Sequence, residues 1–409
     1  MTSPPSASAR SKRPPKPWVP VSRRCDSGTL RLLTLDGGAA AAIQARVIRQ
    51  IELDRPGFLA EVDLLAGSSD GCLVSFFLAT HLATYPDFDG MSLVEAEVQR
   101  RLVDRDNARV VDRCVAFVDQ TAAALRPSLR DWAAFTLGLR PLKDGRGLHA
   151  VFREHFKELC LGDVHEKLVI GIAMDMCANR PRTFRNFGWE AARPELREQV
   201  LGEKLADVAR YSSAVPILLP MIWSKGFPAE LEPHLYADGS LVANNPTMTA
   251  LTNAISYLAG EGEEGGVSLT PPTPPKHEHL GHVAVVSLGA CEEPRLRGEG
   301  EVNQGWPGWL LGRRLNLASL ALNGWLLPGN TEVHNQARHL LGDHHYFRVC
   351  PDVPIKAILA QLFFGSPQGV ARLCQQAADA YVASEEYGRL LSWMDDQPWG
   401  RPRPPAAAR

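Results

Sequence analysis

Two apolar stretches near the beginning of the sequence each run into a glycine-containing turn that is followed by a helical pattern. Residues 30–35 and 61–66 have the composition of short buried strands. The segments 39–53 and 72–82 carry apolar side chains at helical spacing. This strand–helix–strand–helix order predicts an α/β fold with a mostly parallel sheet. Functional residues are then expected at the carboxyl ends of the strands.

The second turn is a G-x-S-x-G motif, Gly67-Ser68-Ser69-Asp70-Gly71. Between a strand and a helix, this motif is typical of a nucleophile elbow, which presents a serine hydroxyl at a helix N-terminus. Gly67 and Gly71 are the small flanking residues that such an elbow requires. The motif alone is equally compatible with a glycine-rich turn in which Ser69 caps the next helix. Ser69 is therefore a candidate nucleophile.

The first turn, Asp36-Gly37-Gly38-Ala39, also has two interpretations. It can be a structural or phosphate-binding turn. It can also be an oxyanion hole, because successive backbone N–H groups without bulky side chains can face an oxygen that becomes charged during acyl transfer. In that case Gly37, Gly38 and Ala39 supply the donors.

A distant Asp238-Gly239 pair completes the set of candidate functional segments. Asp-Gly is a common turn dipeptide, so a hairpin turn is the simplest interpretation. A carboxylate at this position could instead accept the proton of Ser69 as the general base of a two-residue dyad.

Taken together, the three segments resemble the patatin-like phospholipases in their order and spacing. That family has an Asp-Gly-Gly-Gly turn followed by an arginine, then a G-x-S-x-G elbow, and a distant Asp-Gly pair. The resemblance covers about residues 29–350. Further matching segments are Ala209-Arg210-Tyr211-Ser212-Ser213-Ala214-Val215-Pro216, residues 238–246 and Val286-Ser287-Leu288-Gly289.

The resemblance implies a patatin-like three-layer α/β/α fold with a mostly parallel central sheet. It implies a Ser69–Asp238 dyad, an oxyanion hole at Gly37, Gly38 and Ala39, and cleavage of glycerophospholipid acyl esters through a Ser69 acyl-enzyme. It implies no metal and no organic cofactor. The expected partner is a phospholipid or another lipid ester. Nucleic acid is not expected, because 44 basic residues are balanced by 46 acidic ones.

Several positions depart from the family pattern. Ala39, Ala41 and Ala42 stand where the family has glycine, arginine and glycine, Asp70 directly follows Ser69, and Ser240 follows Gly239. Alanine adopts positive φ less readily than glycine does, and a missing guanidinium removes a cation that could orient the turn. The alternative function is therefore a catalytically weakened or inactive protein of the same fold that binds lipid or a protein partner.

The histidines suggest two further alternatives. His277, His279 and His282 form an H-x-H-x-x-H pattern that could bind a metal ion, although Glu278 is the one carboxylate beside it. One of these, or a later histidine, could complete a Ser-His-Asp triad with Ser69. The later candidates are His334, His339, His344 and His345. We do not expect the metal site, because the three histidines flank a predicted flexible loop and have no other carboxylate beside them. We do not expect the triad, because the dyad that the resemblance implies needs no histidine.

Composition predicts how the chain is divided. We expect a disordered arm at 1–28, a catalytic domain at 29–350 with a helical insertion at about 93–162 and a flexible loop at 260–276, a helical extension at 351–397 and a disordered tail at 398–409.

Apolar patterning also predicts where the protein resides. No stretch is apolar enough over the length of a membrane span, and residues 1–20 lack the apolar core of a secretory signal. The eight cysteines include no C-x-x-C pair, which agrees with a reducing compartment. We expect a cytoplasmic protein. The segment 306–327 is either a core helix or an interfacial lid, in which Trp306, Trp309 and Trp325 contact a membrane peripherally.

Overall fold

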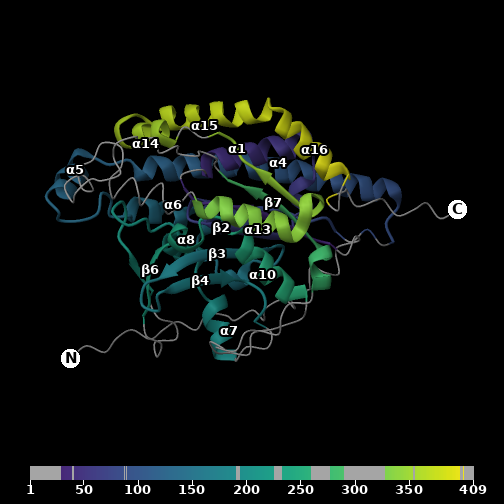
Figure 1. Ribbon diagram of the computed structural model, residues 1–409, viewed down its shortest axis with the longest axis horizontal. Helices are drawn as coiled ribbons and strands as arrows, with labels where there is room; N and C mark the ends of the chain where they lie inside the picture. The colour runs from purple at the N-terminus through teal and green to yellow at the C-terminus, as the bar shows by residue number, and fades with distance from the viewer. Residues whose placement is uncertain are drawn as a thin grey trace.

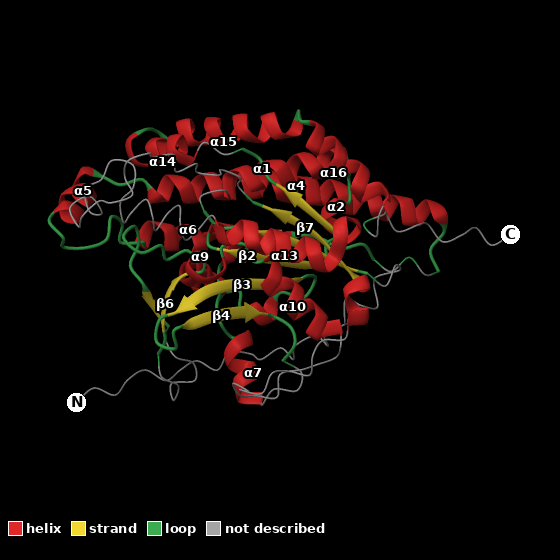
Figure 2. Ribbon diagram, viewed as in Figure 1, coloured by secondary structure: helices red, strands yellow, loops and turns green. Residues whose placement is uncertain are grey.

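An eight-stranded, mostly parallel sheet lies at the centre of the protein in the computed structural model (Figures 1 and 2). The order is β5-β6-β3-β2-β1-β7-β8, with β4 beside β3. The strands are β1 (Leu30–Leu35), β2 (Leu64–Ser68), β3 (Leu168–Asp175), β4 (Arg180–Arg185), β5 (Ile222–Trp223), β6 (Leu235–Asp238), β7 (Val283–Leu288) and β8 (Tyr346–Val349). The structure describes residues 29–38, 41–86, 88, 90–189, 194–224, 233–258, 277–289, 328–352, 355–396 and 399.

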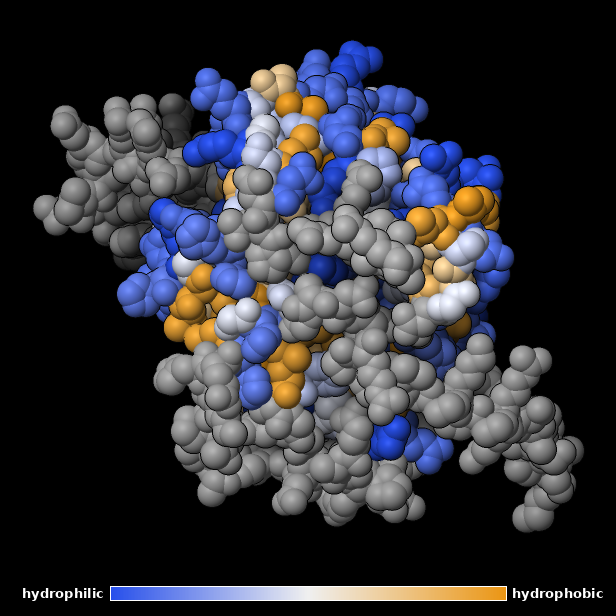
Figure 3. Space-filling view, turned by 90° about the vertical axis from the view of Figure 1, so that its right-hand side faces the viewer, coloured by the Kyte–Doolittle hydropathy of each residue, from blue (hydrophilic) through white to orange (hydrophobic). Residues whose placement is uncertain are grey.

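The pairing divides the sheet into a parallel part and an antiparallel edge. Strands β3, β2, β1, β7 and β8 run parallel to one another. Strands β4 and β6 run antiparallel to β3, and β5 runs antiparallel to β6. The carboxyl ends of the parallel strands point to the left in Figure 2. Figure 3 shows the opposite end, where hydrophobic side chains form small separate groups among hydrophilic ones.

Helices cover both faces of the sheet, because alternate strand residues point to opposite sides. Leu33 and Leu35 of β1 belong to one buried cluster, and Leu30 and Leu32 belong to the other. The first cluster includes side chains of α1 (Ala41–Asp54), α3 (Asp70–His81), α6 (Arg146–Phe156) and α8 (Leu205–Ser212), with α4 (Leu93–Leu125), α14 (Ile355–Phe364), α15 (Pro367–Val382) and α16 (Glu385–Asp396). The second includes α10 (Thr247–Leu258) and α13 (Pro328–His345). The expected three-layer α/β/α architecture is therefore confirmed.

The other helices of the described residues are short: α2 (Phe58–Glu61), α5 (Leu129–Thr136), α7 (Pro194–Leu201), α9 (Ser240–Ala243) and the 3₁₀ turns η2 (Leu161–Asp163) and η3 (His277–His282).

The longest helix, α4, begins and ends where its local sequence requires. Ser92 and Glu95 form a reciprocal capping box at its start. It ends at Leu125, two residues before Pro127, which disfavours helical geometry in the residue that precedes it. Buried residues recur at helical spacing from Val110 to Thr121 and pack against the first cluster.

One strand begins later than the sequence pattern predicts. Residues 58–61 form α2, and β2 starts at Leu64 rather than at residue 61. Gly57, with φ of 92°, turns the chain into α2, and the Glu52 carboxylate accepts the N–H groups of Gly57 and Leu59 at 3.1 and 2.8 Å. These carboxylate contacts hold the turn and are not visible in apolar periodicity.

Several expectations fall outside the described residues. The predicted arm at 1–28, the loop at 260–276, the lid with Trp306, Trp309 and Trp325 and the tail from 400 onward lie there. The division into domains stays a prediction. In the part of the chain that is described, no helix is both long and apolar enough to cross a membrane.

The described cysteines include a disulfide-bonded residue as well as free thiols, whereas the sequence pattern favours a reducing compartment. Cys350 is disulfide-bonded, whereas the other described cysteines are free thiols: Cys72, Cys114, Cys160, Cys177 and Cys374.

The start of α3 packs directly on the end of β1. A Cβ atom on Gly71 would lie 2.2 Å from the carbonyl oxygen of Leu35. We expect Gly71→Ala to lower the free energy of unfolding by about 3 kcal/mol, because backbone must move to admit the methyl group. Urea unfolding measures the change. Gly388→Ala in α16, where a Cβ meets nothing within 4 Å, is the matched control and should stabilise by about 0.5–1 kcal/mol. Equal effects of the two substitutions would contradict this packing.

Candidate active site

Ser69 occupies a sharp turn between β2 and α3. Its backbone has φ of 51° and ψ of −122°, and α3 begins at the next residue, Asp70. A Cβ on Gly67 would lie 2.2 Å from the carbonyl oxygen of Gly71, so both motif glycines are sterically required. Backbone strain of this kind costs about 1–3 kcal/mol and is concentrated at functional sites. The G-x-S-x-G motif therefore has the geometry of a nucleophile elbow.

The Ser69 hydroxyl donates a hydrogen bond to the carboxylate of Asp238. The distance from Oγ to Oδ2 is 2.7 Å, and both residues are buried. They are separated by 169 residues in the sequence. The two candidate dyad residues are thus brought together without an intervening histidine.

The edge of β3 explains how the two residues meet. Ser68 pairs with Ile172, and Asp238 pairs with the next residue of β3, Ala173. Because β4 occupies the other edge over the same residues, β2 and β6 share one edge of β3. The carboxyl ends of β2 and β6 therefore lie next to each other, which brings Ser69 and Asp238 to one site.

Burial sets the protonation of Asp238. Removal from water raises the pKa of its carboxyl to about 7, although hydrogen bonds from Ser69 and Ser240 lower it, and the nearby charge of Asp70 adds to the increase. The backbone N–H of Ser240 donates to Oδ1 at 2.7 Å, which leaves Oδ2 directed at Ser69. A base with a pKa near neutrality can both accept and return a proton at physiological pH.

Ser212 is a supporting residue to which sequence reasoning gave no role. Its hydroxyl accepts the backbone N–H of Ser69 at 2.9 Å, and its carbonyl accepts the N–H of Gly239 at 2.9 Å. The next contact along this segment runs from the N–H of Asp238 to the carbonyl of Ala214 at 3.0 Å. Ser212 thus fixes both halves of the candidate dyad. The one sequence signal for Ser212 was that it lies within Ala209–Pro216, a segment that matches the family pattern.

The glycine turn after β1 lies against the elbow, but one of its predicted donors is already engaged. The Gly37 N–H donates to the carbonyl of Asn244 at 2.9 Å, so it is directed at the protein rather than at a substrate oxygen. A Cβ on Gly37 would lie 2.9 Å from the Cβ of Ser69, so glycine is needed there for close approach. Gly38 has φ of 97°, and its N–H has no acceptor among the described residues. Ala39 lies outside the described residues.

A cation does reach this turn, although not from the position expected in the sequence. Arg348 of β8 donates from Nη1 to Oδ1 of Asp36 at 3.0 Å and from Nη2 to Oδ2, and Nη1 also donates to Ser287 at 2.7 Å. The Asp36 side chain is fully buried, and that of Arg348 is 9% exposed. The bidentate geometry holds the start of the turn. Ala41 stands where the family has an arginine, but the guanidinium of Arg348 reaches the turn instead.

A glycine and a glutamine complete the support of the turn. A Cβ on Gly289 would lie 1.9 Å from Nη2 of Arg348, so a side chain there would displace the guanidinium. Nε2 of Gln44 donates to the carbonyl of Asp36 at 2.8 Å. Contacts from β7, β8 and α1 thus converge on a single residue, Asp36.

Two of the candidate histidines have partners other than the dyad. His334 bonds to the hydroxyl of Tyr346 at 3.1 Å, and His345 bonds to the carbonyl of Val283 at 3.1 Å. His279 and His282 belong to η3, which precedes β7 and lies at the amino end of the parallel strands. Among the described residues, no histidine is hydrogen-bonded to Ser69 or Asp238, and no group of three metal-ligating side chains is present.

The chain belongs to the patatin-like phospholipases, whose family model matches residues 33–251. Patatin-like protein 2 from Oryza sativa subsp. indica is 24% identical over 269 residues, which is 63% of this chain and 60% of that protein. The japonica protein of the same name matches equally. The chain therefore spans about 60% of the length of these relatives. The crystal structure of VipD from Legionella pneumophila aligns over 87% of this chain and 67% of that chain, with 12% identity and a TM-score of 0.32.

The Asp36–Arg348 pair provides a test of how the turn is held. We expect Arg348→Met to lower the free energy of unfolding by about 3–5 kcal/mol, because it leaves a buried carboxylate without its counter-charge. Urea unfolding measures the loss. Arg338→Met breaks an exposed pair with Asp343 and should cost at most about 1 kcal/mol. A loss no larger for Arg348→Met than for this control would show that the buried pair does not hold the turn.

Proposed function

We propose that the protein is a serine lipid acyl hydrolase that cleaves carboxylic esters of glycerophospholipids. The observation that carries the proposal is the 2.7 Å hydrogen bond from Ser69 Oγ to Asp238 Oδ2 at a strained elbow. Membership of the patatin-like phospholipases supports a lipid ester as substrate.

The geometry supports a two-step reaction through an acyl-enzyme. Ser69 Oγ attacks the ester carbonyl carbon while its proton passes to Oδ2 of Asp238. The C–O bond to the lipid alcohol then breaks, and Asp238 returns the proton to the departing alkoxide. In the second step water attacks the acyl carbon, gives its proton to Asp238, and releases the fatty acid as Ser69 regains a proton.

The carbonyl oxygen that becomes charged needs donors near Ser69. The N–H of Gly38 is the candidate among the described residues, supported by the N-terminus of α3, whose dipole favours a developing anion. Asp70 in the first turn of α3 carries a charge that opposes this anion. Catalysis therefore depends on how well the glycine turn compensates for Asp70.

Single substitutions at the dyad test the mechanism. We expect Ser69→Ala to lower kcat/KM on phospholipid and on a short-chain p-nitrophenyl ester by about 10⁴-fold or more, and Asp238→Asn by about 10²- to 10⁴-fold. Ser68→Ala is the matched control, because the Ser68 hydroxyl is buried and has no hydrogen-bond partner in the part of the chain that is described. Equal activity in wild type and Ser69→Ala would reject the proposed nucleophile.

The raised pKa of Asp238 gives a separate test by pH. Because the base must be deprotonated to accept the Ser69 proton, kcat/KM should rise with pH through about 7 and then level off. Initial rates of hydrolysis of the short-chain p-nitrophenyl ester, measured across the pH range, test this rise in kcat/KM. A rate that stays constant between weakly acidic and weakly basic pH argues against Asp238 as the base.

The alternative is an inactive protein of the same fold that binds lipid or a protein partner. It is favoured by the engagement of the Gly37 N–H with Asn244. A fluorophosphonate probe separates the two possibilities, because it labels an activated serine. Labelling of wild type but not of Ser69→Ala supports the hydrolase, and absence of labelling in a folded wild type supports the alternative.

A further inference from the structure

Exposed leucines gather on α5 and the turn that follows it. Leu129, Leu137 and Leu139 are 88%, 73% and 72% exposed. Gly138 between the last two has φ of 69°, and a Cβ there would meet nothing within 4 Å. Single exposed apolar residues are ordinary, but a group of large ones marks an interaction surface.

Other exposed apolar residues extend this group. Phe364, at the end of α14, is 74% exposed and stacks on Trp132 of α5 with 5.4 Å between ring centroids. Ile217 is 67% exposed, and its carbonyl accepts the N–H of Leu142 at 3.0 Å, which joins the two loops. Trp223 of β5 is 58% exposed. We call Leu129, Leu137, Leu139, Ile217, Trp223 and Phe364 the apolar rim.

The apolar rim borders the candidate active site. Ile217 follows three residues after Ala214, whose carbonyl accepts the N–H of Asp238. Trp223 pairs with Leu235 on β6, the strand that ends at Asp238. Figures 1 and 2 place α5 and β6 at the end of the molecule toward which β3 points. A surface that contacts the rim is therefore also near Ser69.

Basic residues accompany the apolar rim. Residues 126–146 contain five basic residues, Arg126, Arg130, Arg140, Lys143 and Arg146, and two acidic ones, Asp131 and Asp144. This is a local excess of positive charge in a chain whose net charge is −2. Arg126 and Arg130 are exposed and have no acidic partner among the described residues.

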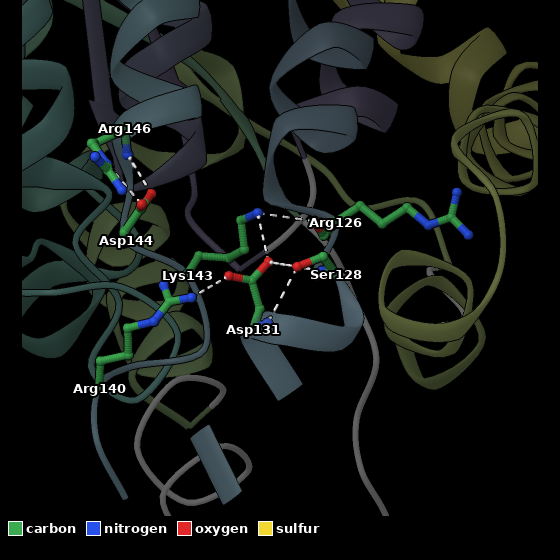
Figure 4. Close-up of polar contacts among 7 residues, drawn as sticks. All are labelled: Arg126, Ser128, Asp131, Arg140, Lys143, Asp144 and Arg146. Atoms are coloured by element: carbon green, nitrogen blue, oxygen red, sulfur yellow. Dashed lines mark hydrogen bonds and ion pairs between the residues drawn. The ribbon is translucent and has the colours of Figure 1, made fainter. Parts of the chain in front are cut away.

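The acidic residues of this segment are neutralised within it. Asp131 accepts from Arg140 at 2.7 Å and from Lys143 at 3.2 Å, and it caps α5 through Ser128 (Figure 4). Burial opposes ionisation, but these hydrogen bonds hold the pKa of the Asp131 carboxyl well below its usual range. Figure 4 shows Arg126 directed away from this cluster. The cations outside the cluster are thus available for an external anion.

We propose that the apolar rim, with Arg126 and Arg130, docks on the surface of an anionic phospholipid bilayer and delivers lipid to Ser69. Protruding leucines and aromatic rings enter the headgroup region, while guanidinium groups bind lipid phosphates. The choice of a bilayer rests on charge complementarity with anionic lipid and on the proposed function, which requires a lipid ester at the adjacent site.

Vesicle binding tests the proposal without turnover. The full chain carrying Ser69→Ala is sedimented with phosphatidylcholine vesicles that contain or lack phosphatidylserine. We expect binding to the vesicles with phosphatidylserine. Leu129→Asp and Leu139→Asp should each weaken it by about tenfold or more, and Arg126→Gln and Arg130→Gln by about fivefold each. The matched controls are Leu53→Asp and Arg49→Gln near the end of α1, where Leu53 and the Arg49 side chain are 47% and 43% exposed. Because α1 follows the carboxyl end of β1, its last turn lies toward the other end of the sheet.

The outcomes separate the possible occupants of the rim. Binding that is equal with and without phosphatidylserine, or equal in the rim variants and the controls, overturns the proposal. Concentration-dependent self-association that is lost in the leucine variants, without vesicle binding, overturns it in favour of a second copy of the chain. Circular dichroism and thermal unfolding confirm that each variant is folded. Because the measurement uses Ser69→Ala, failure of the hydrolase proposal leaves this test intact.

Discussion

The candidate site depends on one edge of β3. That edge pairs with β2 as far as Ile172 and with β6 from Ala173 onward, so two strands that approach from opposite directions end beside each other. Hydrogen bonding of the sheet fixes the register, and the register fixes the distance between Ser69 and Asp238. The backbone strain at Ser69 is sustained because Gly67 and Gly71 permit close backbone packing and the Ser212 hydroxyl accepts the N–H of Ser69.

Two buried carboxylates at this end of the sheet have different partners and therefore different chemistry. Asp36 binds a guanidinium in bidentate geometry, which keeps its oxygens occupied and anchors the glycine turn. Asp238 has no cationic partner among the described residues, and burial raises the pKa of its carboxyl to about 7. The first arrangement stabilises a loop, and the second leaves a proton acceptor poised beside a hydroxyl. Both depend on exclusion of water by the helices on either face.

Much of the fold and part of the site were predictable from local signals. The strand 30–35, the G-x-S-x-G elbow and the α/β order rest on patterns within a few residues, and the fold class was confirmed. The start of β2 was wrong, because Glu52 contacts stabilise α2 over residues 58–61. Ser212 and Arg348 were not assigned, because their partners lie 143 and 312 residues away. The engagement of the Gly37 N–H with Asn244 is likewise a contact between distant segments.

By itself, the sequence determined which residues are candidates for the proposed acyl transfer and that they stand at strand ends, since side-chain chemistry and glycine steric requirements are local properties. Only the tertiary structure decided which of these residues meet, which amide of the glycine turn stays available, and that a guanidinium reaches Asp36 from β8 rather than from the turn itself. It also gathered leucines, aromatic rings and arginines from α5, α14 and β5 at the same end as Ser69. The physical reason is that strand register and side-chain packing join segments far apart in the sequence, whereas hydrophobic periodicity reports only on neighbouring residues.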